Sequence, residues 1–183
     1  LLTLCMLALC LCASAKETCP KVIPALQEWK GESGKLVLPA EGSIVIAPAD
    51  EAVLKSVAAV LAQDLKDLLD WNYTVKTGKP EKNAIYLSLM KSDKQLGEEG
   101  YVLTAERYAG IAAPARQGVF WGTRSLLQIL YNEKGQLPKG VARDWPQYPN
   151  RGFMLDVGRK FFTMDFLRQY VKILSFYKLN EFQ

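Results

Sequence analysis

The chain contains no histidine among its 183 residues. Nucleophilic triads that use an imidazole base and metal sites that need a His ligand are therefore excluded within this sequence. Cysteine is also scarce, since of four residues only Cys19 lies beyond the first dozen positions. If those positions are removed, no intramolecular disulfide can form. Without a histidine base, Cys19 is better interpreted as a stray thiol than as a nucleophile.

The sequence also lacks a cluster of basic residues. Lys and Arg number 23 against 19 Asp and Glu, and the cations are spread along the chain. No Lys/Arg-rich run of the kind that follows a phosphate backbone is present, so we expect no nucleic acid partner. Hydrophobic residues make up 49% and charged residues 23%, which indicates a globular chain rather than a disordered one.

The first 15 residues are apolar and uncharged, and they end in the small residues Ala13-Ser14-Ala15. This composition is typical of a secretory signal peptide, and we expect cleavage after Ala15. The stretch is too short for a transmembrane segment, which needs about 20 apolar residues. Lipid anchoring through Cys10 or Cys12 is the alternative. We therefore expect an exported protein that is periplasmic, at the cell surface or extracellular.

Residues 16–148 combine two helical patterns with several strand patterns. The helical patterns occupy residues 51–71 and 115–135, and the strand patterns lie near 36–38 and at 42–47, 72–78, 83–90, 98–106 and 108–114. This order predicts an α+β domain with a mostly antiparallel sheet and two helices on one face. Residues 136–150 contain three prolines and are predicted to form a linker, with the domain boundary near residue 148.

Two glycines, Gly118 and Gly122, flank the aromatic pair Phe120-Trp121 at the start of the second helical pattern. One interpretation is an aromatic platform that stacks on a sugar. The other is a helix start that packs closely on its neighbours, where a side chain would not fit. We favour close packing.

The last 33 residues contain the charged residues that are the strongest candidates for a functional site. The segment "GFMLDV", residues 152–157, is apolar on both faces, which predicts a strand buried in a parallel sheet or a barrel wall. Asp156 lies near its end and Arg159 follows. Thr163 is a suitable N-cap for a helix, and a second strand begins after residues 178–180. The residues alone leave several interpretations open. Asp156 is either a loop-fixing carboxylate or a site residue. Arg159 is a surface cation, a partner for Asp156 or a ligand contact.

The segment "YPNRGFMLDVGRKFFTMDFLRQYVKILSFYKLNEFQ" closely resembles the start of the catalytic barrel in family-20 glycoside hydrolases, the β-N-acetylhexosaminidases. The pattern Arg-Gly-x-x-x-Asp-x-x-Arg, followed by an aromatic pair and a helix ending in Tyr-x-Lys-Leu-Asn, carries the resemblance. The segment "GYVLTAERYAGIAAPARQGVFWGTRSLLQIL" is similar to the accessory domain that precedes this barrel. The resemblance implies that 16–148 is the accessory domain and that 149–183 begins a (β/α)₈ TIM barrel.

The resemblance also implies roles for individual residues. Arg159 would bind hydroxyls of the terminal sugar, because a guanidinium can hold two neighbouring hydroxyls at once. Asp156 would support it, and Arg151, at the entry end of the strand, would be structural. Many relatives have His after the second Arg of the motif, where this chain has Lys160. That difference leaves the fine contacts of the loop open.

The family mechanism is retaining and substrate-assisted, with a Glu as general acid and base and an adjacent Asp that orients the substrate acetamido group. We expect this Asp-Glu pair to lie in a missing part of the barrel, so the printed chain is interpreted as an inactive fragment with no catalytic residue, cofactor or metal of its own. The expected partner is a glycan ending in N-acetylhexosamine, and the oligomeric state is undetermined. Two alternatives are another glycosidase with the same accessory domain and a non-catalytic carbohydrate-binding or scaffold protein.

Overall fold

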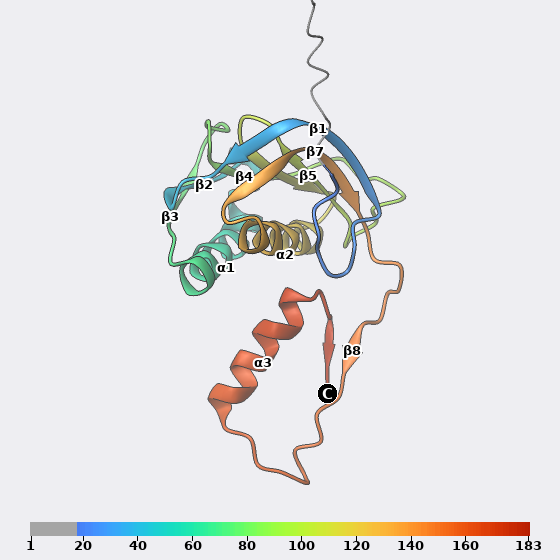
Figure 1. Ribbon diagram of the computed structural model, residues 1–183. Coiled ribbons are helices and arrows are strands. Elements are labelled where there is room, and N and C mark those ends of the chain that lie inside the picture. The colour runs from blue at the N-terminus through green and yellow to red at the C-terminus, as the bar shows by residue number, and fades with distance from the viewer. Residues whose placement is uncertain (1–17) are drawn as a thin grey trace, which may run out of the picture.

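The computed structural model describes residues 18–183 and shows two units joined by a short loop (Figure 1). We call residues 18–144 the N-terminal unit and residues 151–183 the C-terminal unit. The predicted signal peptide, residues 1–15, lies outside the described residues. Within residues 18–183, none of the helices has the length and apolar character that crossing a membrane requires.

The N-terminal unit is built around one seven-stranded sheet with the strand order β1-β7-β5-β6-β4-β2-β3. The strands are β1 (Glu28–Val37), β2 (Glu41–Ile46), β3 (Asn72–Thr77), β4 (Ile85–Leu89), β5 (Tyr101–Ala105), β6 (Ala109–Ala113) and β7 (Gln136–Asp144). Helix α1 (Glu51–Leu69), entered through the short 3-10 turn η1 (Pro48–Asp50), and helix α2 (Arg116–Asn132) complete the unit. The predicted α+β class is confirmed.

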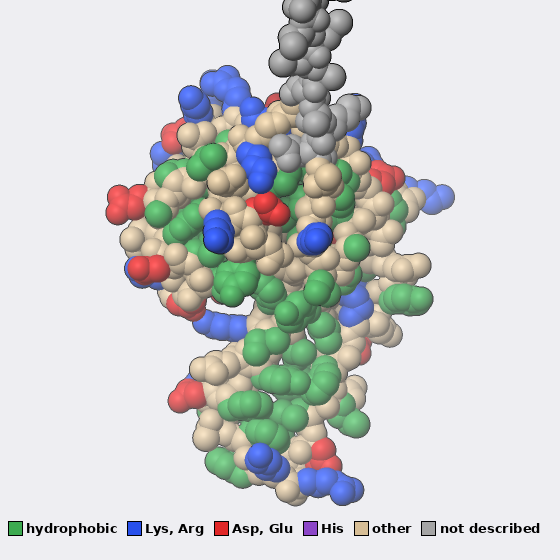
Figure 2. Space-filling view, viewed as in Figure 1, with side chains coloured by type: hydrophobic (Ala, Val, Ile, Leu, Met, Phe, Trp, Pro, Cys, Tyr) green, Lys and Arg blue, Asp and Glu red, His purple; other side chains and the backbone are tan. Residues whose placement is uncertain are grey.

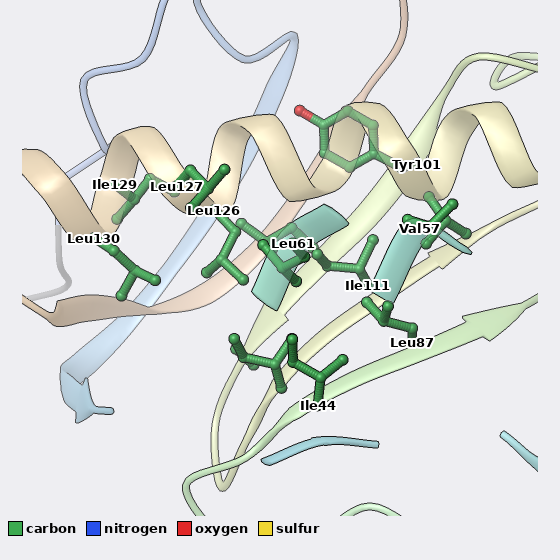
Figure 3. Close-up of a cluster of buried hydrophobic side chains, with 14 of the residues drawn as sticks. Ile44, Val57, Leu61, Leu87, Tyr101, Ile111, Leu126, Leu127, Ile129 and Leu130 are labelled. Atoms are coloured by element: carbon green, nitrogen blue, oxygen red, sulfur yellow. The ribbon is translucent and has the colours of Figure 1, made fainter. Parts of the chain in front are cut away.

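Both helices cover the same face of the sheet, as predicted, and the core lies between them and the strands (Figure 1). The apolar positions of α1 recur at helical spacing, so one stripe of the helix is buried while the rest faces water. Figure 3 shows the core side chains, which include Ile44, Leu61, Leu87, Ile111, Leu126 and Leu130. All of these are less than 2% exposed.

The prediction of a mostly antiparallel sheet holds for only one half. The pairs β1/β7, β7/β5 and β5/β6 are antiparallel, whereas β6/β4, β4/β2 and β2/β3 are parallel. The parallel pairing of β2 with β3 follows from α1, because a helical crossover between these strands returns the chain in the same direction. The sheet is therefore mixed.

Strands β1 and β7 depart most from the sequence prediction. β1 covers ten residues rather than a short stretch near 36–38, because its alternating polar residues suit an edge strand with one exposed face. Most of the predicted linker forms β7, which lies between β1 and β5. Pro138 is tolerated there because β5 pairs only with residues 140–144, so the missing N–H falls beyond the end of that strand.

The C-terminal unit is a strand-helix-strand unit of β8 (Gly152–Phe153), α3 (Met164–Phe176) and β9 (Glu181–Phe182). β8 and β9 pair in parallel, as predicted for a crossover through a helix. Tyr170 on α3 packs against Phe153 on one strand and Phe182 on the other, with ring centroids 5.3 and 5.8 Å away. These aromatic contacts hold the helix on the strand pair.

The prediction that residues 152–157 are buried on both faces is wrong for this chain. Met154 and Val157 are 72% and 57% exposed. The reason is that among residues 18–183 only β9 pairs with β8, so its other edge has no partner strand. Apolar side chains consequently gather on the surface of the C-terminal unit (Figure 2).

The glycines at the start of α2 serve close packing. A Cβ on Gly118 would lie 2.2 Å from the Gly100 carbonyl oxygen and 2.8 Å from the Ala113 Cβ. A Cβ on Gly122 would lie 2.5 Å from the Ile111 side chain. All three distances are shorter than such atoms can approach, so these glycines allow α2 to lie directly on the sheet.

We predict that Gly118→Ala destabilises the fold. Overpacking of a core costs about 1–3 kcal/mol, and the gain in helix propensity is only about 1 kcal/mol. The new Cβ would meet the Gly100 backbone carbonyl, so we take the upper end of the cost and expect a net loss of about 2 kcal/mol in the free energy of unfolding, measured by urea denaturation. Gly78→Ala is the control, since its Cβ would lie at an ordinary 3.8 Å from Val45. Equal stability of the two variants would contradict the packing role.

Candidate functional site

The loop after β8 carries the two residues predicted for the site. The Arg159 Nε lies 3.0 Å from Asp156 Oδ2, and the Gly158 backbone N–H donates to Asp156 Oδ1 at 2.9 Å. Asp156 therefore fixes the turn through the Gly158 N–H and also binds the Nε edge of the Arg159 guanidinium. The Arg159 side chain is 90% exposed and that of Asp156 57%, so the structure brings the pair together at the surface.

Hydrogen bonds at both ends define this loop. Before it, the parallel ladder continues past β8, since the Leu155 N–H donates to the Gln183 carbonyl at 2.8 Å. After it, Thr163 caps α3 by accepting from the Phe166 N–H, as predicted, and Asp165 lies in the first turn. Arg159 is thus placed just beyond the carboxyl end of a parallel strand, where barrel enzymes carry their chemistry.

Arg151, at the opposite end of β8, has a structural role. Its Nε donates to the Lys178 carbonyl at 2.8 Å, and its Nη2 donates to Glu99 Oε2 at 2.5 Å. Its guanidinium also lies over the Trp121 ring, 5.6 Å from the centroid. Arg151 therefore joins the entry end of β8 to the turn before β9 and to the N-terminal unit.

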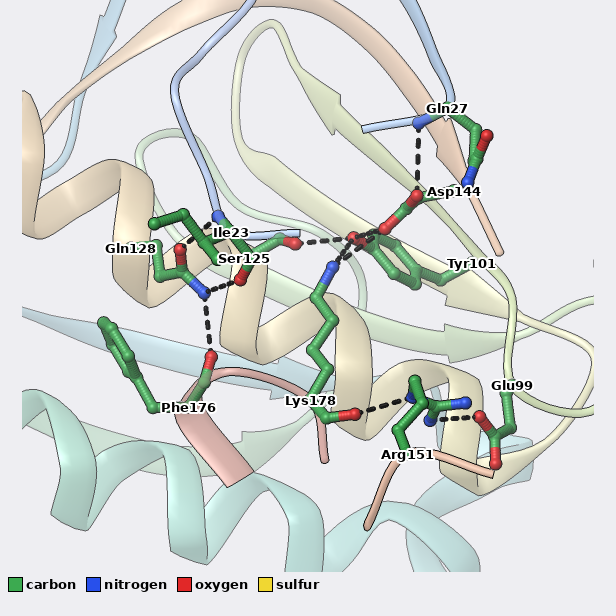
Figure 4. Close-up of polar contacts among 10 residues, drawn as sticks. All are labelled: Ile23, Gln27, Glu99, Tyr101, Ser125, Gln128, Asp144, Arg151, Phe176 and Lys178. Carbon is green, nitrogen blue, oxygen red and sulfur yellow. Dashed lines mark hydrogen bonds and ion pairs between the residues drawn. The ribbon is translucent and has the colours of Figure 1, made fainter. Parts of the chain in front are cut away.

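A buried polar cluster at this junction was not anticipated from the sequence. Lys178 Nζ donates to Asp144 Oδ2 and to the Tyr101 hydroxyl, both at 2.8 Å (Figure 4). The Tyr101 hydroxyl donates to Asp144 at 2.6 Å and lies 2.5 Å from the Ser125 hydroxyl. The Lys178 and Asp144 side chains are each 8% exposed. Lys178 lies between a predicted helix and a predicted strand, and Asp144 lies in a predicted linker. Neither position carries a periodic signal that would predict the pair.

Burial dominates the protonation of this cluster. It lowers the pKa of the Lys178 ammonium, and the negative charge of Asp144 opposes that shift. It raises the pKa of the Tyr101 phenol well above the ordinary value, and Asp144 raises it further. The tyrosine therefore stays neutral and acts as a hydrogen-bond bridge within the cluster.

A cavity of about 440 Å³ opens beside the junction, with Trp121, Trp145 and Tyr148 in its lining. Its two carboxylates are Glu99 and Asp144. Both are already committed to ion pairs, with Arg151 and Lys178 respectively. The cavity therefore offers no free carboxylate for acid-base chemistry. Within residues 18–183, no group of three His, Cys, Asp or Glu side chains is placed to hold a metal ion.

Two family models match the chain. The model described as "Glycosyl hydrolase family 20, domain 2" matches residues 19–145. The model described as "Glycosyl hydrolase family 20, catalytic domain" matches residues 148–183. The first covers most of the N-terminal unit and the second the whole C-terminal unit, including Asp156 and Arg159.

Individual proteins agree with the family models. A beta-hexosaminidase of Porphyromonas gingivalis is 34% identical over 140 residues, which cover 70% of this chain and 18% of that protein. A lacto-N-biosidase of Bifidobacterium bifidum is 28% identical over 165 residues, 89% of this chain and 14% of that protein. The structure of a beta-N-acetylhexosaminidase from Streptomyces coelicolor matches with a TM-score of 0.77 and 26% identity over 92% of this chain and 35% of that chain. This chain therefore spans less than a fifth of the length of the first two relatives.

The raised pKa of Tyr101 predicts a stability that falls at high pH. An unfolded tyrosine loses its proton near pH 10, whereas the folded Tyr101 keeps it. Its contribution is therefore fully present below about pH 10 and is lost as the pH rises through the folded pKa. We expect the stability advantage of the parent chain over Tyr101→Phe to shrink as the pH rises above about pH 10, measured by urea denaturation from about pH 8 to about pH 11. A constant difference across this range would contradict the assignment.

Proposed function

Because this chain belongs to glycosyl hydrolase family 20, we propose that it forms the N-terminal part of an exo-acting β-N-acetylhexosaminidase. The substrate would be a glycan that ends in N-acetylglucosamine or N-acetylgalactosamine. The observation that carries the proposal is the position of Arg159, which follows a parallel strand in the segment matched by the catalytic-domain model. The names of the relatives support the same activity.

In this proposal Arg159 binds hydroxyls of the terminal sugar. Its Nε contacts Asp156, while its two terminal amino groups have no partner among residues 18–183. A planar guanidinium held at one edge can present those groups to two neighbouring hydroxyls. Asp156 then serves as a support, because it holds both the arginine and the backbone of the turn.

The β8-α3-β9 unit is proposed to be the first unit of a (β/α)₈ barrel. Two observations support this: the parallel pairing of β8 and β9 through a helix, and the apolar surface of the unit. A barrel would cover such a surface with further strands and helices. We propose the division at 16–148 and 149–183, with export directed by residues 1–15, as the arrangement that suits this enzyme class.

The proposed reaction is retaining and substrate-assisted, so it needs a Glu general acid with an adjacent Asp. The one adjacent Asp-Glu pair in the sequence is Asp50-Glu51. Asp50 stands directly before α1, but its carboxylate accepts the Leu89 N–H at 2.7 Å and makes no cap hydrogen bond. This pair belongs to the N-terminal unit, so we propose that the catalytic pair is not among these residues.

A second candidate is an enzyme of lacto-N-biosidase type, which the match to the Bifidobacterium bifidum protein favours. In both candidates Arg159 would have the same role, because both act on sugars whose hydroxyls it could bind. They differ in whether an N-acetylglucosaminide or a lacto-N-bioside is the better substrate. Comparing kcat/KM for these two substrates with the complete gene product separates them.

We predict that Arg159→Ala in the complete gene product lowers kcat/KM for a chromogenic N-acetylglucosaminide. Hydrogen bonds from a charged group contribute about 1.5–3 kcal/mol, which corresponds to a loss of about 10- to 150-fold. Arg168→Ala is the matched control, because Arg168 also forms an exposed pair with an aspartate three residues away, Asp165, but lies on α3. If both variants kept parent activity, the role of Arg159 would be refuted.

We also predict that residues 16–183 alone release no chromophore from the same substrate. The physical reason is the missing general acid, without which the leaving group is not protonated. The measurement is an end-point assay on the purified chain, with the complete gene product as the positive control. Turnover by the purified chain that persists in Asp50→Asn and Glu51→Gln variants would require a different catalytic group within these residues.

A further inference from the structure

The last residue of α3 and the turn that follows it, residues 176–180, are held by buried side chains of the N-terminal unit (Figure 4). Gln128 on α2 is 4% exposed and donates to the Phe176 carbonyl at 2.8 Å. Two residues further along, Lys178 Nζ reaches Asp144 at the end of β7 and Tyr101 at the start of β5. Both contacts are buried hydrogen bonds with fixed partners. They therefore specify one position of the turn, whereas apolar contacts would allow several.

The same turn sets how β9 lies beside β8. The Lys178 carbonyl accepts from Arg151 Nε, and the Arg151 N–H donates to Asn180 Oδ1 at 2.9 Å. The Asn180 N–H donates back to the Arg151 carbonyl at 2.9 Å. Lys178 itself has a φ of +60°, in the left-handed region that non-glycine residues rarely adopt. The entry ends of both strands are therefore tied to one residue whose side chain is anchored in the N-terminal unit.

We propose that Lys178 and Asp144 are positioning residues that fix the β8–β9 pair, and through it the loop that carries Arg159, relative to the N-terminal unit. The inference rests on the proposed function, since it is Arg159 that would contact the sugar. Asp144 pairs with Lys178 at the entry ends of β8 and β9, whereas the loop with Asp156 and Arg159 follows the opposite end of β8. Asp144 would therefore act on that loop indirectly, through Lys178 and the strand pair. The N-terminal unit thereby fixes the position of β8 and β9 in the C-terminal unit.

A second contact between the units provides the matched control. Lys172 on α3 lies 2.7 Å from Asp67 on α1, and their side chains are 59% and 42% exposed. Exposed pairs contribute little because water screens them, whereas a buried charge that loses its partner is left uncompensated. Lys172→Met should therefore remove an ion pair between the units without disturbing the strand pair.

The first test is hydrogen exchange on the chain itself. In Asp144→Asn and in Lys178→Met, the N–H groups of Leu155, Asn180 and Gln183 should exchange at least about tenfold faster, because each closes the β8–β9 ladder. The N–H groups of Ala47 and Ala109, which donate to the Leu87 and Ala84 carbonyls in the N-terminal sheet, should stay within about twofold. Lys172→Met should change neither set.

Two results would overturn the proposal: unchanged exchange in the β8–β9 ladder, or equal acceleration at Ala47 and Ala109, which would indicate general loss of stability. If Asp144→Asn fails to fold, Tyr101→Phe decides in its place. It keeps the ring and deletes only the hydroxyl that accepts from Lys178, so it should accelerate the same three amides, by a smaller factor. No acceleration in Tyr101→Phe would count against the proposal.

The second test uses the complete gene product. Asp144→Asn should raise KM for the N-acetylglucosaminide by about tenfold, but by less than about twofold in an Arg159→Ala background, because the group that it positions is then absent. Equal effects in the two backgrounds would mean that Asp144 does not act through Arg159. If Arg159→Ala alone left KM and kcat/KM unchanged, the proposed function would fail, and the exchange experiment would still decide whether the pair registers the strands.

Discussion

The buried ion pair between Lys178 and Asp144 is the contact on which the arrangement of the two units depends. Removing one partner of a buried pair costs about 3–5 kcal/mol, since the other charge remains without compensation in a medium that solvates it poorly. The Tyr101 hydroxyl and the Gln27 N–H complete the hydrogen bonding of Asp144. A satisfied pair of this kind favours one geometry, whereas an apolar junction would tolerate several.

The residues that attach the C-terminal unit and the residues proposed to contact the sugar lie at opposite ends of β8. Arg151, Lys178 and Asn180 gather at the entry ends of β8 and β9 and bind the N-terminal unit. Asp156 and Arg159 lie beyond the opposite end of β8, at the surface. This polarity matches the general division in barrels between a stabilising face and a catalytic face. The N-terminal unit contributes a closely packed support, in which α2 lies directly on the sheet at Gly118 and Gly122.

Periodicity predicted the helices and most strands because one face of each is buried, as with Leu54, Leu61 and Leu65 in α1. It failed for β7, where prolines suggested a linker, and for the parallel half of the sheet, because strand direction depends on long-range pairing. Residue types and the family resemblance predicted the Asp156–Arg159 loop. The Lys178–Asp144 pair could not be predicted, since these residues are 34 positions apart and neither follows a pattern.

The measurement that tests the central claim most directly is a crystal structure of the complete gene product with N-acetylglucosamine bound. The account predicts that the sugar lies beyond the carboxyl end of β8, with Arg159 amino groups within hydrogen-bonding distance of its hydroxyls and the Lys178–Asp144 pair intact. A sugar bound in a closed site that Arg159 does not reach would contradict the account, because the loop after β8 would then have no part in recognition.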